Sequence, residues 1–131
     1  MCIFCKIINK EIPSHLFYED ERVVAFLDIK PVNPGHALVV PKTHYESLED
    51  ISDEDLMAVA RAVKKVGQLI KDKLDVVGYN ASVNNGSVAG QEVPHLHVHL
   101  IPRHAGDGHT PWSRGAYASG EAEEIIKKLI S

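Results

Sequence analysis

The stretch Pro94-His95-Leu96-His97-Val98-His99-Leu100-Ile101-Pro102 decides how the rest of the chain is interpreted, because three histidines alternate in it with apolar residues. In an extended strand successive side chains point to opposite faces, so the pattern predicts one face of imidazoles and one apolar face directed at a core. Side chains on the same face would lie roughly 6.5–7 Å apart. Neighbouring rings at that spacing can act on one phosphate or one metal ion.

A structural interpretation of these histidines has to be weighed against a functional one. A single histidine in a strand is usually a half-buried side chain with a satisfied hydrogen bond. Three in strict alternation are different, because each imidazole titrates near neutral pH and three charged neighbours would repel one another. A purely structural strand gains nothing from them that Thr or Val would not supply, so the pattern favours chemistry.

Length and composition restrict the class of protein. The chain has 131 residues, 44% of them hydrophobic, which predicts one domain over residues 1–131 with its own core. Its 14 basic and 18 acidic residues give a net charge of −4, whereas a broad nucleic-acid interface would need a basic face. No apolar stretch approaches the ~18 residues of a membrane span. We therefore expect neither nucleic acid nor membrane as a partner, and a cytoplasmic location.

Hydrophobic periodicity predicts an α+β chain. Strand-like runs precede the histidine strand, the fifth, at residues 15–19, 23–27, 36–40 and 78–83. A short helix is expected over 4–9 and a long one after Ser52, whose side chain can cap it. The apolar stripe by which the long helix would pack on the sheet is Leu56, Val59, Ala60, Val63, Val66 and Ile70.

The C-terminal part is expected to hold an irregular segment and a final helix. Residues 104–115 include Gly106, Gly108, Pro111 and Trp112, and Trp112 either covers apolar surface or reaches the site of a partner subunit. Residues 119–130 then show a helical pattern that predicts packing. Its apolar stripe is Ala122, Ile125, Ile126 and Leu129.

The two cysteines of the chain, Cys2 and Cys5, form a C-x-x-C pair at the N-terminus. In an intracellular chain this spacing suggests metal binding or redox chemistry more than a structural disulfide. A thioredoxin-like pair would follow a buried strand, and no strand precedes this one. A zinc ion needs four ligands, so two more would have to come from the eight histidines.

The segment from Asn84 to Gln91 is rich in small residues and ends four residues before His95. Alone it would be an ordinary connection between two strands. Glycines also allow backbone N–H groups to curl around an anion, and the position of this segment would bring such an anion to the histidine face. A phosphate held there beside neutral imidazoles is a coherent site for phosphorus chemistry.

Residues 95–101 resemble the signature of the histidine triad superfamily of nucleotide hydrolases and transferases. The likeness covers most of the chain and includes Cys2–Ile8, Phe26–Pro31, Pro34–His36, Val40–His44, Asn84–Gly86 and Ala89–Gln91. This resemblance implies an α+β fold with a five-stranded antiparallel sheet and a long packed helix. It also implies a homodimer in which the two sheets join into one of ten strands.

The resemblance further implies a hydrolase or nucleotidyl transferase that acts at the α-phosphate of a purine nucleotide derivative. The middle histidine of the triad, here His97, would be the nucleophile and form a covalent nucleotidyl-histidine that water resolves. A neutral imidazole needs no activating base at pH 7, which independently suits this role. By resemblance, His99 and His36 would stabilise charge on the phosphate or leaving group.

Substrate-binding residues are implied in the same way. Asp28 would accept hydrogen bonds from the ribose hydroxyls, and Asn84 and Gln91 would bind the phosphate or leaving group together with His99. Apolar side chains that would wall the base, or simply belong to the core, are Ile3, Phe4, Ile7, Phe26 and Leu27. Glu92 stands where related enzymes often have Ser or Thr, and an ionised carboxylate there repels phosphate or favours an amine.

Members of this superfamily that keep the N-terminal C-x-x-C resemble zinc proteins whose ligands correspond here to Cys2, Cys5, His44 and His95. Four such ligands suit a structural zinc ion, which would remove the first triad histidine from catalysis. The alternative is two reduced cysteines in a short helix. No organic cofactor is expected.

Two rival functions remain open at this point. In the first, His95, His97 and His99 jointly bind a catalytic zinc ion. In the second, the chain is a nucleotide-binding regulator with little catalysis. The substrate is also open, since phosphoramidates, adenylylated amines and dinucleoside polyphosphates all occur in the superfamily.

Overall fold

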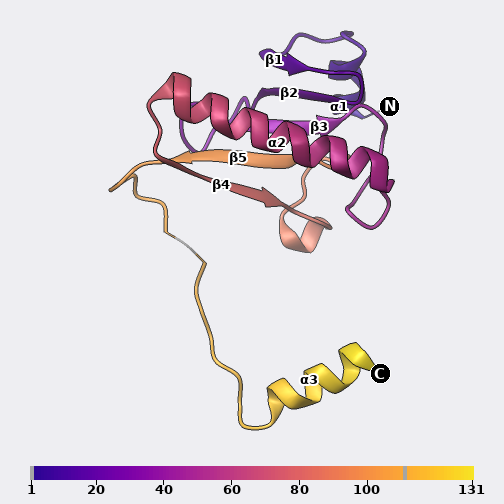
Figure 1. Ribbon diagram of the computed structural model, residues 1–131, viewed down its shortest axis with the longest axis vertical. Coiled ribbons are helices and arrows are strands. Elements are labelled where there is room, and N and C mark those ends of the chain that lie inside the picture. The colour runs from indigo at the N-terminus through magenta and orange to yellow at the C-terminus, as the bar shows by residue number, and fades with distance from the viewer. Residues whose placement is uncertain (1, 111) are drawn as a thin grey trace.

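The computed structural model describes residues 2–110 and 112–131, and its centre is a five-stranded antiparallel sheet (Figure 1). The strands lie in the order β1-β2-β3-β5-β4, and every neighbouring pair is antiparallel. Their bounds are Leu16–Glu19 for β1, Val23–Leu27 for β2, Ala37–Pro41 for β3, Gly78–Val83 for β4 and Val98–Arg103 for β5. The predicted α+β class with five strands is confirmed.

The long helix α2, Asp53–Leu74, covers one face of this sheet. Ser52 caps it as predicted, since its side chain accepts a hydrogen bond from the Asp55 N–H. The core between helix and sheet is apolar and includes Val23, Ala25, Val39, Val98 and Leu100 from the strands, with Val59, Ala62, Val66 and Ile70 from α2. The alternation in the triad stretch thus directs its apolar side chains toward α2, as expected.

The predicted stripe on α2 is partly wrong. Leu56 and Ala60 are exposed, while Asp55, Ala58 and Ala62 are buried. The small alanines allow the helix to lie close to the sheet, and the buried Asp55 forms hydrogen bonds with polar side chains. The helix is therefore rotated relative to the orientation that its larger apolar residues predict. Hydrophobicity alone does not register either effect.

Helix α1, Ile3–Ile8, covers the opposite face of the sheet at β2 and β3. Phe4 from α1 packs there with Val24, Phe26, Leu38 and Val40. Because β2 and β3 are buried on both faces, they consist of continuous apolar residues without alternation. This second cluster fixes α1 beside the triad histidines.

The predicted histidine strand begins later than expected, at Val98. Backbone groups of the preceding residues bind elsewhere: the His95 N–H donates to the Val93 carbonyl, and the Leu96 N–H donates to the Tyr45 carbonyl at 2.6 Å. His95 and His97 therefore lie on a segment that leads into the sheet, and only His99 lies on β5 itself.

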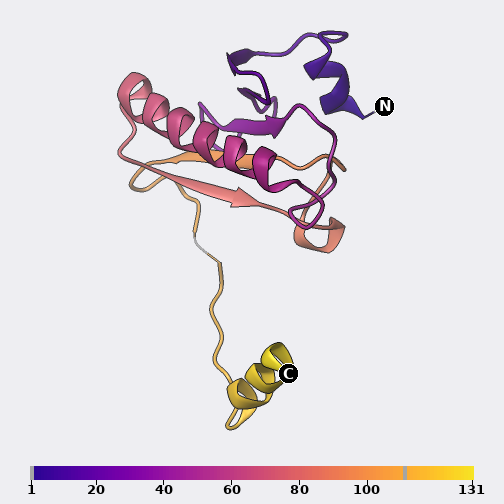
Figure 2. The same ribbon diagram turned by 45° about the vertical axis from the view of Figure 1, so that its right-hand side comes forward.

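The C-terminal helix α3, Glu121–Ile130, stands apart from the sheet, beyond the β4 edge (Figures 1 and 2). None of its residues is buried, and Ile126 and Leu129 are 52% and 73% exposed. The packing expected from its stripe is thus absent within the described part of the chain, because the segment before it runs away from the body. No helix among the described residues has the length and apolar character that a membrane span requires.

Candidate active site and metal centre

A hollow of about 530 Å³ opens between α1, the end of β2 and the triad segment. One wall is apolar and consists of Ile3, Phe4, Ile7, Ile12, Phe26, Leu27 and Leu38. The polar residues that line it are Ser14, Asp28, Lys30, Asn84, Glu92, His97 and His99. A second hollow of about 740 Å³ lies by the end of α2 and is lined mostly by apolar side chains with His15, Lys73 and His104. The triad histidines His97 and His99 line the first hollow.

His97 is 6% exposed, and its ring is held in one orientation. Its Nδ1 lies 2.7 Å from the His95 carbonyl oxygen. A carbonyl can only accept, so Nδ1 carries the proton, and in the neutral ring Nε2 keeps its lone pair. The Phe4 ring meets the imidazole edge to face, with 5.0 Å between centroids. His97 thus has the tautomer that a nucleophilic imidazole needs.

His36 and His99 form a hydrogen-bonded chain that starts at the backbone. The Val32 N–H donates to His36 Nδ1 at 3.0 Å, so the proton of the neutral His36 ring is on Nε2. That Nε2 lies 2.9 Å from His99 Nδ1, to which it donates. His99 is left with a proton on Nε2, and because its side chain lines the hollow, it is a donor suited to a phosphate oxygen.

Both rings of this chain are kept neutral. Burial lowers the pKa of His99 from 6.5 to about 4, and charge repulsion from His97 and His36 adds to the effect. Burial also lowers the pKa of His36, although the Asp28 carboxylate, 3.6 Å from His36 Nε2, acts in the opposite direction. At neutral pH the pair is therefore a chain of hydrogen bonds and not a pair of cations.

Asp28 follows β2 directly, and hydrogen bonds of its backbone and side chain fix its position. Its N–H donates to the His36 carbonyl at 2.9 Å, and its Oδ1 accepts from the Lys30 N–H at 2.9 Å. Its carboxylate lines the hollow between the apolar wall and the histidines.

The segment 84–91 contains a short 3-10 helix, Ser87–Ala89, and Gln91 braces it. Gln91 Oε1 accepts from the Gly86 N–H at 2.8 Å, and its Nε2 donates to the carbonyls of Glu46 at 2.7 Å and Val93 at 3.1 Å. Gln91 does not line the hollow, whereas Asn84 does. Of the two amides predicted to bind substrate, the structure brings only Asn84 to the pocket wall, and the Gln91 amide is engaged by backbone groups of Gly86, Glu46 and Val93.

Cys2, Cys5, His44 and His95 meet at the N-terminal end of α1 and form a possible metal site. The six distances among the two Sγ and the two Nδ1 atoms all lie between 3.1 and 3.6 Å. Zinc bonds of about 2.3 Å to sulfur and 2.0–2.1 Å to nitrogen require separations of about 3.3–3.8 Å in a tetrahedron. The four donors thus occupy the corners of such a tetrahedron within a few tenths of an ångström.

The tautomer of His95 also fits a metal ligand. Its Nε2 donates to the Pro41 carbonyl at 2.8 Å, which leaves the lone pair on Nδ1, the atom that faces the cysteines. The second group with metal-binding residue types, Asp28, His36 and His99, is unlike it. There the Val32 N–H occupies His36 Nδ1, so Nε2 keeps its proton and has no lone pair for a metal.

A family comparison agrees with this geometry: the model of the HIT domain matches residues 9–106. The chain belongs to the HIT domain family. The match to the histidine triad signature is thereby confirmed, and the matched range leaves out the two cysteines and the C-terminal helix of this HIT protein.

Relatives of the HIT protein extend over most of its length. An uncharacterized HIT-like protein of Methanocaldococcus jannaschii is 51% identical over 98% of both chains. An adenosine 5'-monophosphoramidase of Saccharomyces cerevisiae is 49% identical over 78% of this chain and 62% of its own. An adenylylsulfatase of Arabidopsis thaliana is 39% identical over 78% of this chain and 52% of its own.

Solved structures show the same fold. The crystal structure of a HIT family member from Bacillus subtilis superposes with a TM-score of 0.89 and 42% identity, covering 98% of this chain and 94% of the other. A zinc-bound histidine triad protein from Mycobacterium smegmatis gives a TM-score of 0.79 and 32% identity, covering 98% and 94%. The superposed part covers nearly the whole chain in both comparisons.

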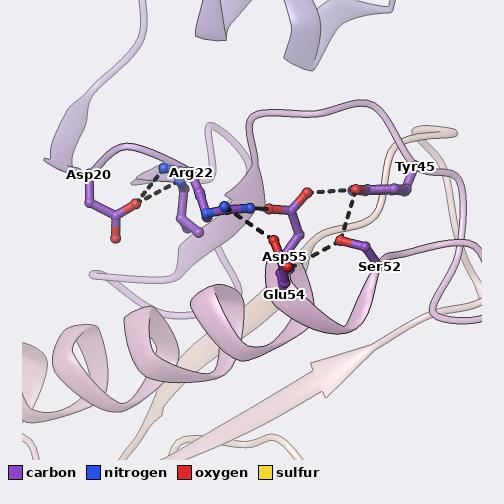
Figure 3. A network of polar contacts seen from close by, with 7 residues as sticks. Asp20, Arg22, Tyr45, Ser52, Glu54 and Asp55 are labelled. Atoms are coloured by element: carbon purple, nitrogen blue, oxygen red, sulfur yellow. Dashed lines mark hydrogen bonds and ion pairs between the residues drawn. The ribbon is translucent and has the colours of Figure 1, made fainter.

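A polar network that sequence reasoning missed holds the segment carrying His44 (Figure 3). The buried Asp55 carboxylate accepts from Arg22 Nη1 at 2.7 Å and from the Tyr45 hydroxyl at 2.6 Å. These two bonds, the Tyr45 bond first, lower the pKa of Asp55. Tyr45 is the neighbour of His44, and its carbonyl accepts from Leu96. The only sequence signal was an acidic residue next to the predicted apolar stripe.

Proposed function

We propose that this HIT protein is a hydrolase that cleaves adenosine or related purine nucleotide derivatives at the α-phosphorus through a covalent nucleotidyl-His97 intermediate. One observation carries the proposal: the buried His97 donates its Nδ1 proton to the His95 carbonyl, which leaves Nε2 unprotonated, and its side chain lines a pocket with an apolar wall. The names of two relatives, an adenosine 5'-monophosphoramidase and an adenylylsulfatase, support an adenylyl substrate.

The proposed reaction has two halves. His97 Nε2 forms a bond to phosphorus while the bond from phosphorus to the leaving group breaks, and the leaving group takes up a proton where its chemistry requires one. His99 Nε2–H donates to a phosphate oxygen in the transition state, and His36 holds His99 in the tautomer that can do so. Water then displaces His97 and releases the nucleoside monophosphate. Asp28 accepts hydrogen bonds from the ribose, and Asn84 contacts the phosphate or leaving group.

Rapid quench of the enzyme with an adenosine phosphoramidate labelled in the adenine ring tests this proposal. We expect the label to become attached to His97, and His97→Ala to lower turnover at least 10³-fold while nucleotide binding survives. His15→Ala is the control, because His15 is exposed and lies outside this pocket. Turnover that survives in His97→Ala would contradict the mechanism, and nucleotide binding without turnover in the wild-type protein would favour a regulator.

We also propose a structural zinc ion held by Cys2, Cys5, His44 and His95. The tetrahedral spacing of the four donors and the zinc-bound relative support it. Because all four positions would be protein ligands, the ion would supply no open site for substrate. It would fix α1, and therefore Phe4, against His97. A catalytic zinc bound by all three triad histidines is disfavoured, since His95 directs its lone pair to the cysteines and His97 directs Nδ1 to a carbonyl.

We propose a homodimer as the working form. β4 is the last strand of the sheet, and its outer edge has no strand beside it in the described part of the chain. The chain beyond residue 104 passes this edge and carries the exposed apolar stripe of α3 past it. A second copy whose β4 pairs with this one would give a ten-stranded sheet and place each α3 on the other subunit. A cytoplasmic location remains a prediction.

A further inference from the structure

The acidic residue Glu92 lines the same pocket as His97 and His99. The structure fixes its backbone from both sides. On one side Gln91 makes its three hydrogen bonds, and on the other Val93 packs in the apolar cluster under α1 and accepts from the His95 N–H. Glu92 lines this pocket and is exposed to solvent. It is thus a carboxylate carried on a fixed backbone at the site of reaction.

The position of Glu92 relative to the other walls indicates which part of a substrate it meets. The apolar wall from α1 and β2 suits a base, and Asp28, which directly follows Leu27 of that wall, lies 3.6 Å from His36 Nε2. Asn84, Gly90 and Glu92 come from the segment after β4 and form the other side. With the base on the apolar wall and phosphorus at His97 Nε2, the departing group extends toward Glu92.

We propose that Glu92 makes the leaving-group side of the pocket selective for groups that carry a positive charge, such as the far amino group of an alkyl diamine or a basic amino acid. The inference rests on the proposed function. An ionised carboxylate accepts hydrogen bonds and donates none, so it pairs with an ammonium group and repels a phosphate chain. Asp28 adds a second negative charge to the same pocket, and Lys30 is its lone lysine or arginine among the described lining residues.

The reaction balances without any further reactant. For a phosphoramidate, the His97 Nε2–phosphorus bond forms, the phosphorus–nitrogen bond breaks and the nitrogen takes a proton from solvent. Water then adds to phosphorus, His97 leaves, and the products are a free amine and the nucleoside monophosphate. Glu92 transfers no proton in this scheme. It binds the cation at the far end of the leaving group, so it determines specificity and not the chemical step.

Two matched phosphoramidates and one anhydride test the inference. The first is AMP joined through nitrogen to butylamine, the second is AMP joined to one end of 1,4-diaminobutane, and the third is diadenosine tetraphosphate. The first two differ only in the terminal ammonium group. The quantity compared is kcat/KM for each substrate in the wild-type protein, in Glu92→Gln, in Glu92→Lys and in a control, Glu21→Gln, whose side chain is exposed in the β1–β2 turn outside the pocket.

For the wild-type protein we expect the diamine derivative to be favoured over the butylamine derivative by about two- to fivefold, which corresponds to the free energy of an exposed charge pair. Glu92→Gln should bring this ratio close to one, and Glu92→Lys should invert it and raise the relative rate with diadenosine tetraphosphate. Glu21→Gln should keep the wild-type ratio. High salt should reduce the preference in the wild-type protein.

An unchanged ratio in Glu92→Gln, or an equal loss in Glu21→Gln, would overturn the inference while the proposed function stands, because turnover of the butylamine derivative and the His97 adduct report on that function separately. No turnover of any of the three substrates by the wild-type protein would overturn both. A preference for diadenosine tetraphosphate in the wild-type protein would overturn the inference alone.

Discussion

At the scale of single residues, the three triad histidines differ because each has a different hydrogen-bond partner. His95 donates to the Pro41 carbonyl, His97 donates to the His95 carbonyl, and His99 accepts from His36. Their alternation with apolar residues correctly predicted that they lie on the face away from the core. The tautomers could not be predicted, because the partners are backbone groups and a ring that are distant in sequence and have no pattern of their own.

Replacing His36 tests this hydrogen-bond chain. His36→Ala removes the donor to His99 Nδ1, reduces the burial of the His99 ring and removes the charge repulsion from His36. The pKa of His99 should therefore rise from about 4 toward its ordinary value of 6.5. Imidazole NMR titration measures this shift directly. Turnover should fall about 10–100-fold, since His99 then has no fixed tautomer. His15→Ala should change neither quantity.

The same change should alter how stability depends on pH. His99 is neutral in the folded state down to about pH 4, whereas in the unfolded chain it binds a proton below about 6.5. The unfolded state therefore gains protons first, and stability falls as pH drops from 6.5 toward 4. In His36→Ala this decline should be shallower, as measured by denaturant unfolding across that range. An equally steep decline would contradict the assignment of a neutral His36–His99 pair.

At the scale of elements, sequence periodicity predicted β2 and β4 with their observed bounds and the other strands within a residue or two, except β5. The start of β5 was missed because the backbone groups of His95 and Leu96 bind outside the sheet. The face of α2 was misplaced because Asp55 is buried with Arg22 and Tyr45, and such a partnership depends on tertiary contacts. Hydrophobic periodicity predicts the buried face of an element well where that element contacts only apolar core residues. It does so less well where buried polar contacts determine how the element packs.

The Asp55 network predicts a link between the start of α2 and the proposed zinc ion. Asp55→Asn should lower the free energy of unfolding by about 2–3 kcal/mol, because two hydrogen bonds to a buried charged group are weakened. The freed Tyr45 segment should also hold His44 less firmly, so zinc should be lost at lower chelator concentration. Elemental analysis of the purified protein should give one zinc ion per chain, and titration with a chelator then measures retention.

Asp53→Asn is the matched control for that measurement, since Asp53 lies in the same first turn of α2 but is exposed. It should cost at most about 1 kcal/mol through the helix dipole and leave zinc retention unchanged. Because the pKa of Asp55 is lowered in the fold, its stabilisation is present above its ordinary value of 3.8 and disappears as pH falls through the folded pKa. The difference in stability between wild type and Asp55→Asn should therefore shrink in acid.

At the scale of the whole molecule, the C-terminal arm, which comprises the segment after β5 and helix α3, is the feature whose position the contacts of a single chain do not explain. Arg103 and Asp107 fix its origin through two hydrogen bonds of 2.8 and 3.1 Å, and Asn33 also donates to Asp107. Beyond this anchor the chain leaves the body, and α3 lies past β4 with its apolar stripe exposed. Sequence periodicity correctly predicted a helix with an apolar face, but it holds no information on which chain covers that face.

The proposed dimer predicts that α3 contributes to the interface between subunits, which can be tested. The wild-type protein should have twice the 14.4 kDa mass of the chain at micromolar concentration. Ile126→Glu places a charge in the α3 stripe, and two such stripes are covered per dimer, so the dissociation constant should rise at least tenfold, given the roughly 1.5–3 kcal/mol gained by burying one isoleucine. Lys127→Glu introduces the same side chain one position away, off the stripe, and should have little effect. Mass measured over a dilution series distinguishes these outcomes.

A wild-type monomer would refute the dimer, and an Ile126→Glu dimer as tight as wild type would show that α3 lies outside the interface.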